Sequence, residues 1–117
     1  MTEYVSLIMQ GSIIRRSSDA GKVRTGAMYA MNALKNGWME DVKIFVFGPA
    51  EHLLLNDPDL QRAVKEYQQM DEKIIACKTF ADRDGLGDGL AKQGVSVEYV
   101  GKMISDLIKD GYVPMVW

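Results

Sequence analysis

Short β-branched and apolar runs alternate with stripes of helical spacing along the whole chain, and this alternation constrains the fold more than any other feature. The runs are too short for helices and have the residue types of buried strands. They occupy residues 4–9, 42–47, 73–77, 95–100 and 112–117. Strands that alternate with helices this regularly predict a mostly parallel sheet with helices on both faces.

Helical spacing is clearest in the segment after the first run, where apolar residues recur every three or four positions. These residues are Val23, Ala27, Ala30, Met31, Leu34 and Trp38. Asp57 followed by Pro58 predicts the start of a later helix, since aspartate caps helices and proline is tolerated at their first position. Pro114 cannot donate a ladder hydrogen bond, so the last strand is expected at an edge. We expect one three-layer α/β/α domain over residues 1–117, with a mostly parallel five-stranded sheet.

The composition limits the function classes. A chain of 117 residues that is 47% hydrophobic suits one domain with a substantial core. Its net charge of −2, with both signs interspersed, argues against a nucleic-acid partner, which requires a clustered basic face. No apolar run reaches the ~20 residues of a membrane span, and we find no signal peptide. With a single cysteine that cannot form an internal disulfide, the chain is expected in the reducing cytoplasm.

Cys77 is the only cysteine, and it ends the third predicted strand. Ligands of open parallel sheets bind beyond the carboxyl ends of the strands, so this position lies on the expected functional edge. A helix N-terminus or a lysine nearby would favour the thiolate, and Lys78 follows directly. The alternative is an inert core thiol, because free cysteines are among the most buried residues. Position alone leaves both interpretations open.

Two other motifs near Cys77 do not form standard sites. The glycines of residues 82–90 (DRDGLGDGL) are spaced G-x-G-x-G, and no Walker lysine follows them. A calcium loop would need a side-chain oxygen ligand where Leu86 stands and a bidentate glutamate where Gln93 stands. We expect a flexible loop there. His52 is the only histidine, which excludes a histidine-rich metal site. A Cys77–His52 dyad is conceivable because both residues lie beyond strand ends, but a surface or interface role for His52 is favoured.

The stretch 51–56 (EHLLLN) places three leucines in a row. A small helix on a sheet edge buries about two of them, so the third suggests a contact between subunits. We therefore favour an oligomer over a monomer.

The whole chain resembles the DsrE/DsrF-like sulfur-relay family, which includes the YchN-like proteins. The resemblance covers all 117 residues, in the same order. It rests on "DAGKVRTGAMYAMNAL", "IFVFGPAEHLLLND", the strand "KIIAC" with the later "GVSVEYVG", and the ending "LIKDGYVPMVW". The strand that ends in alanine and cysteine is its most specific part.

This resemblance implies an α/β fold that assembles into homo-oligomers, often trimers or hexamers. It also implies that Cys77 accepts sulfur as a persulfide and passes it to a partner protein. The backbone of Lys78, Thr79 and Phe80 and the Lys78 ammonium would stabilise the thiolate, with His52 and Gly48 as further binding candidates.

Chemistry agrees with a carrier, since sulfur transfer needs one thiolate, no cofactor and no metal. A disulfide oxidoreductase would want a second cysteine, and this chain has none. The alternative is a non-catalytic oligomeric scaffold of the same fold, which binds a small ligand or a partner at the strand-end edge.

Overall fold

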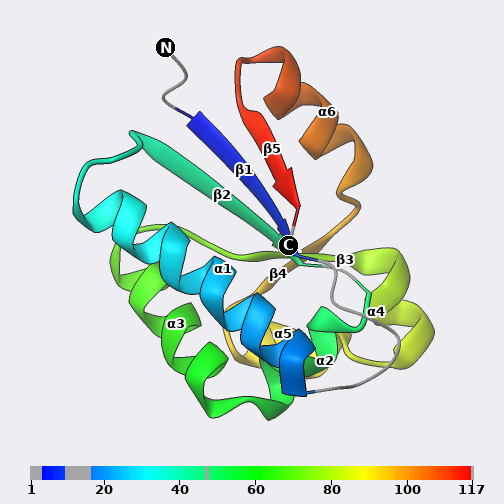
Figure 1. Ribbon diagram of the computed structural model, residues 1–117. Helices are drawn as coiled ribbons and strands as arrows, with labels where there is room; N and C mark the ends of the chain where they lie inside the picture. Colours follow the sequence, from blue (N-terminus) through cyan, green and yellow to red (C-terminus); the bar gives the residue numbers. More distant parts are fainter. Residues whose placement is uncertain (1–3, 10–16, 47, 117) are drawn as a thin grey trace.

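The computed structural model describes residues 4–9, 17–46 and 48–116 (Figure 1). Strands and helices alternate along this part of the chain. In chain order the elements are β1 (Tyr4–Met9), α1 (Ser17–Lys35), β2 (Asp41–Val46), α2 (Ala50–Asn56), α3 (Pro58–Gln69), β3 (Ile75–Cys77), α4 (Lys78–Asp84), α5 (Gly87–Lys92), β4 (Ser96–Glu98), α6 (Gly101–Lys109) and β5 (Val113–Val116).

The strands form one sheet in the order β4-β3-β2-β1-β5, and every neighbouring pair runs parallel. The α/β class expected from the sequence is confirmed. β3 and β4 are only three residues long, shorter than the apolar runs that predicted them. β5 lies at one edge of the sheet, as expected from Pro114, which cannot donate a hydrogen bond to a further strand. None of the described helices is both long enough and apolar enough to cross a membrane.

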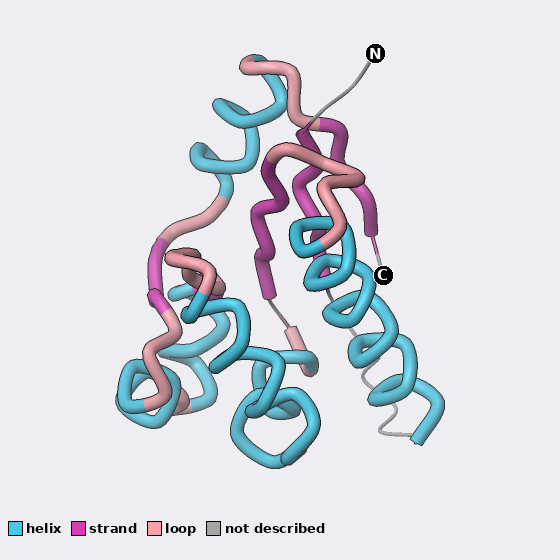
Figure 2. The backbone as a smooth tube through the Cα atoms, turned by 90° about the vertical axis from the view of Figure 1, so that its left-hand side faces the viewer, coloured by secondary structure: helices cyan, strands magenta, loops and turns pink. Residues whose placement is uncertain are grey.

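The helices divide unequally between the two faces of the sheet. Strands β1 to β4 step across the sheet in one direction, and only the connection from β4 to β5 steps back. Right-handed crossovers therefore place α1 to α5 on one face and α6 on the other. Figure 2 shows α1 and α6 on opposite sides of the strands. In the described part of the chain, α6 alone covers its side.

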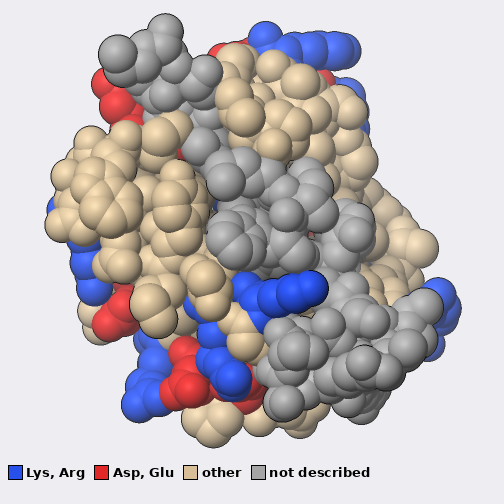
Figure 3. All heavy atoms as spheres, in the orientation of Figure 1, with Lys and Arg blue, Asp and Glu red and all other residues tan. Residues whose placement is uncertain are grey.

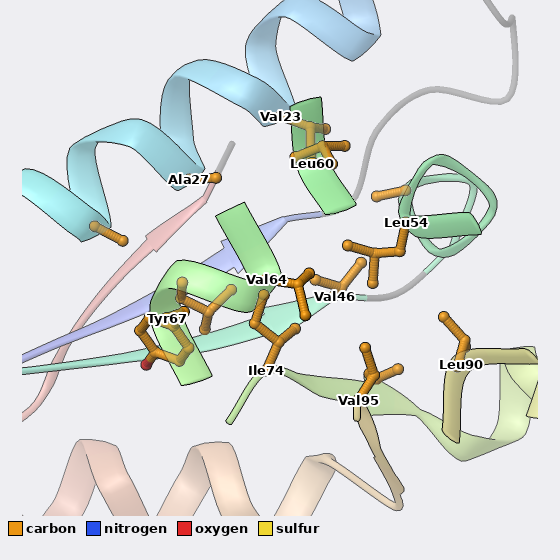
Figure 4. Close-up of a cluster of buried hydrophobic side chains, with 14 of the residues drawn as sticks. Val23, Ala27, Val46, Leu54, Leu60, Val64, Tyr67, Ile74, Leu90 and Val95 are labelled. Atoms are coloured by element: carbon orange, nitrogen blue, oxygen red, sulfur yellow. The ribbon is translucent and has the colours of Figure 1, made fainter. Parts of the chain in front are cut away.

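The main core fills the space between the sheet and the larger helical layer (Figure 4). Val46 and Ala76 supply fully buried side chains from the centre of the sheet. The helices contribute Val23 and Ala27 from α1, Leu54 from α2, Leu60, Val64 and Tyr67 from α3, and Leu90 from α5. The hydroxyl of Tyr67 donates a hydrogen bond to the backbone oxygen of Val42, so its one polar atom is satisfied inside the core.

The structure corrects three expectations. Trp38 does not lie on the first helical stripe, because α1 ends at Lys35 and the tryptophan is 61% exposed. Residues 82–90 are mostly helical rather than a flexible loop. Gly85 ends α4 in the left-handed conformation at φ 68°, and α5 begins two residues later. The leucine run also leaves no exposed leucine, because Leu54 is buried and both its neighbours pack against the core.

The turn into β4 generates a stability prediction. Gly94 has φ +82°, and a Cβ there would lie 2.2 Å from the Gln68 amide nitrogen. That amide donates to the Gln93 carbonyl at 2.9 Å, so Gly94→Ala adds strain and breaks this bond. We expect a loss of roughly 1–3 kcal/mol in the free energy of unfolding, measured by urea titration.

Gly21 is the matched control. It lies inside α1, and a Cβ there would meet nothing within 4 Å. Gly21→Ala should therefore stabilise the protein by roughly 0.5–1 kcal/mol. Equal effects of the two substitutions would contradict this account of Gly94.

Candidate functional site

Cys77 is the last residue of β3 and the N-cap of α4. Its neighbour Ala76 is fully buried in the core, whereas Cys77 is only partly buried. Successive strand residues face opposite sides, so Cys77 faces away from the main core, toward the face that carries α6. Its thiol is free and makes no capping hydrogen bond to α4. The structure therefore gives Cys77 the position of an available thiol at the end of its strand.

Lys78, Thr79 and Phe80 form the first turn of α4, directly after Cys77. The Lys78 ammonium bonds the Asp82 carboxylate at 3.0 and 3.2 Å, and this pairing raises the pKa of Lys78. The same ammonium lies 5.9 Å from the centre of the Tyr99 ring. Lys78 thus connects α4 with the residue that follows β4, and Thr79 is exposed to solvent.

His52 lies on α2, and its ring is engaged by α4. Its Nε2 is 2.8 Å from a carboxylate oxygen of Asp84, and its ring packs edge-on against Phe80, with centroids 5.9 Å apart. The hydrogen bond with His52 lowers the pKa of Asp84. Among the described residues, no hydrogen bond joins His52 to Cys77, so the structure does not form the conceivable dyad. His52 instead holds α2 against α4.

Gly48 and Glu51 form the turn from β2 into α2. Gly48 has φ 72°, a conformation that favours glycine, and its carbonyl accepts the Glu51 N–H at 3.0 Å. The Glu51 side chain is fully buried, and among the described residues neither carboxyl oxygen has a hydrogen-bond partner at normal distance, although the nearby Gly48 backbone opposes the effect of burial on its pKa. Burial raises the pKa of Glu51 to about 8, and the negative charge of Asp84 adds to the shift.

Sequence reasoning missed Glu51 and Tyr99. Glu51 precedes a histidine and an apolar run, which looks like an ordinary exposed glutamate in a first helical turn. The apolar run of residues 95–100 predicts a strand that includes Tyr99, but β4 ends at Glu98 and the residue is 66% exposed.

A second charged cluster lies at the opposite, amino end of the strands. Lys43 bridges Asp41 at 3.3 Å and Glu72 at 3.1 Å, and the Tyr112 hydroxyl donates to Asp41 at 2.5 Å. Burial would raise the pKa of Asp41, but its hydrogen bonds and the Lys43 charge outweigh burial and lower it. The cluster lies far from the expected functional edge and joins strand ends to one another.

Charges of both signs mix on the face of the molecule that Figure 3 shows. Lysine and arginine side chains lie beside acidic ones, most closely at the lower left of this view. This arrangement matches the interspersed signs of the sequence.

The solved structures that share this fold include two proteins of unknown function. A conserved protein of unknown function from Bacteroides thetaiotaomicron, BT1422, has a TM-score of 0.75 and 23% identity, and the match covers 96% of this chain and 94% of that one. A protein of unknown function from Methanobacterium thermoautotrophicum, MTH1491, has a TM-score of 0.66 and 18% identity, over 97% and 99% of the two chains. No family model and no curated protein matches the sequence. At these identities the likeness shows the fold alone.

The buried carboxyl of Glu51 predicts a pH dependence of stability. Its pKa is about 8 in the folded protein against an ordinary 4.5, so the folded state holds a proton that the unfolded state releases. The stability present below pH 4.5 should be lost as the pH rises to about 8, by on the order of 4 kcal/mol. Urea titrations across this range measure the loss.

Glu51→Gln should remove most of this pH dependence and make the protein more stable than the wild type at pH 8. The exposed Glu66, substituted in the same way, is the matched control and should leave the profile unchanged. A wild-type profile that is flat from pH 4.5 to 8 would overturn this role of Glu51.

Proposed function

We propose that this chain is a small sulfur carrier, which holds sulfane sulfur as a persulfide on Cys77 and relays it to a partner protein. One observation carries the proposal: Cys77 is a free, partly buried cysteine at the carboxyl end of an interior parallel strand. This edge is where open α/β sheets place their reactive groups. The resemblance to the sulfur-relay family assigns the same role to the cysteine that ends this strand.

The chemistry needs few groups. The thiolate attacks a sulfane sulfur, and the persulfide that forms is later attacked by the acceptor thiol. Cys77 serves both steps, while the backbone N–H groups of Lys78 to Phe80, which open α4, donate to the sulfur anion. His52 takes no part, because Asp84 engages its ring. No cofactor is required, and the single cysteine suits a reducing cytoplasm.

Cys77→Ser should abolish sulfur loading and leave the fold intact, because the side chain is not part of the main core. The measurement is the intact mass of the native protein after incubation with polysulfide or thiosulfate. The wild type should gain the mass of sulfur or of a thiosulfonate, and the serine variant should gain neither. Loading that persists in the variant would refute the proposal.

A second candidate is a non-catalytic oligomeric scaffold, and the exposed apolar residues of the α6 side favour it. None of the residues of α6 is buried, although the helix is strongly amphipathic. Ile108 and Val113 are 46% and 41% exposed. The exposed Tyr99 lies two residues before the start of α6. Such a surface suits a second copy of the chain. We propose a homo-oligomer, a trimer or hexamer as the family resemblance implies, for the carrier and the scaffold alike.

Thiol reactivity separates the two candidates. An aromatic disulfide reagent should modify Cys77 rapidly in the native carrier. In an inert scaffold it should react only after unfolding.

Ile108→Glu should shift the protein toward smaller species in native mass spectrometry, because it places a charge on the apolar face of α6. Met28→Glu is the matched control, since Met28 is also apolar and is more exposed than Ile108, but lies on α1, in the opposite layer. If both variants keep the wild-type mass distribution, α6 is not the subunit contact.

A further inference from the structure

At one place in the described sheet, two adjacent strands are followed by helices that lie on opposite faces of the sheet. β3 and β4 are neighbours in the sheet. β3 leads into α4, in the larger helical layer, whereas β4 leads into α6 on the other side. The carboxyl ends of such a strand pair splay apart and leave a crevice, which is where open α/β sheets bind ligands.

A hollow of about 550 Å³ lies at this point, within the size range of small-molecule sites. Its lining combines the start of α4, the end of β4 and residues of α6 as far as Asp106. Cys77 is not itself a lining residue, but it adjoins two of them. Lys78 follows it in the chain, and Glu98 is its partner across the β3–β4 ladder, on the same side of the sheet.

The lining carries two cationic and two anionic groups together with apolar surface. Lys78 and Lys102 supply ammonium groups, Glu98 and Asp106 supply carboxylates, and Tyr99 and Met103 supply apolar surface. Lys78 and Lys102 are paired with carboxylates of their own helices at 3.0 and 2.8 Å. Such exposed pairs contribute little, so a ligand carboxylate can replace them. A lining of this kind suits a zwitterion rather than a simple anion.

We infer that this crevice binds the small sulfur donor or acceptor of Cys77, and that this molecule is a zwitterionic thiol of the amino-acid or short-peptide class. The inference rests on the proposed function. The single ammonium group of the ligand binds the carboxylates of Glu98 and Asp106, its carboxylate groups bind the lysines, and its carbon chain lies along Tyr99. Inorganic sulfane donors are too small to require the hollow.

The transfer step balances without another reactant. The Cys77 thiolate attacks the outer sulfur of a persulfide R–S–SH, and a new bond forms between Sγ and that sulfur. The S–S bond of the donor breaks, its electron pair leaves with the thiolate RS⁻, and the proton stays on the transferred sulfur. The reverse step delivers the sulfur to a thiol of the same class.

Reduced glutathione is the probe for binding, and Cys77→Ser is the protein, so that no sulfur chemistry intervenes. Glutathione should shift the amide resonances of Glu98, Tyr99, Lys102 and Met103 saturably in a nitrogen-15 NMR titration. Adding Lys78→Gln and Lys102→Gln should weaken binding by at least roughly tenfold. Adding Lys35→Gln instead is the matched control, since Lys35 is an exposed, ion-paired lysine of the other layer, and it should change nothing.

Loading of the wild type by inorganic polysulfide, followed by mass spectrometry, separates this inference from the proposed function. If Cys77 loads sulfur but glutathione shifts nothing in the crevice, or binds equally well without the two lysines, the crevice inference is overturned and the carrier stands. If glutathione binds in the crevice but no sulfur loads, the carrier falls and a zwitterion site remains. If neither occurs, both are overturned.

Discussion

The packing of β2 and β3 under α2 and α3 is the interaction on which the site depends. Val46 and Ala76 lie side by side in the parallel ladder, and both are completely buried. Val46 is the last residue of β2, and Ala76 is the next-to-last residue of β3. Their burial therefore fixes the position at which both strands end. Cys77 is held one residue beyond this anchor. The apolar core therefore sets where the thiol emerges, although the thiol itself faces the other way.

The same packing explains how much of the fold could be predicted. The strand-end position of Cys77 followed from a short apolar run and the rules of parallel sheets, and the α/β class followed from alternation. The helical state of residues 82–90 could not be predicted in this way, because glycine and aspartate have low helix propensity. There, Leu86 and Leu90 reach the core, and the free energy of their burial outweighs local preference.

The site was harder to predict than the fold, since its parts meet only in three dimensions. Sequence placed His52 and Cys77 together beyond strand ends, but the partner of His52 is Asp84, 32 residues away. The loss of Tyr99 from the predicted strand, the burial of Glu51 and the crevice between β3 and β4 all depend on the direction in which the chain leaves each strand. Local residue patterns carry no information on that direction.

The position of β1 has a consequence for how the chain folds as it is synthesised. β1 pairs with β2 on one side and with β5 on the other, and Figure 1 shows the blue and red strands side by side. β2 follows β1 closely, but residues 113–116 are made long afterwards. Until then β1 presents an open row of backbone N–H and C=O groups, the kind of edge on which other chains add strands. The hydrogen bond from Tyr112 to Asp41 lies directly before β5, and its formation late in folding seats the strand that closes this edge.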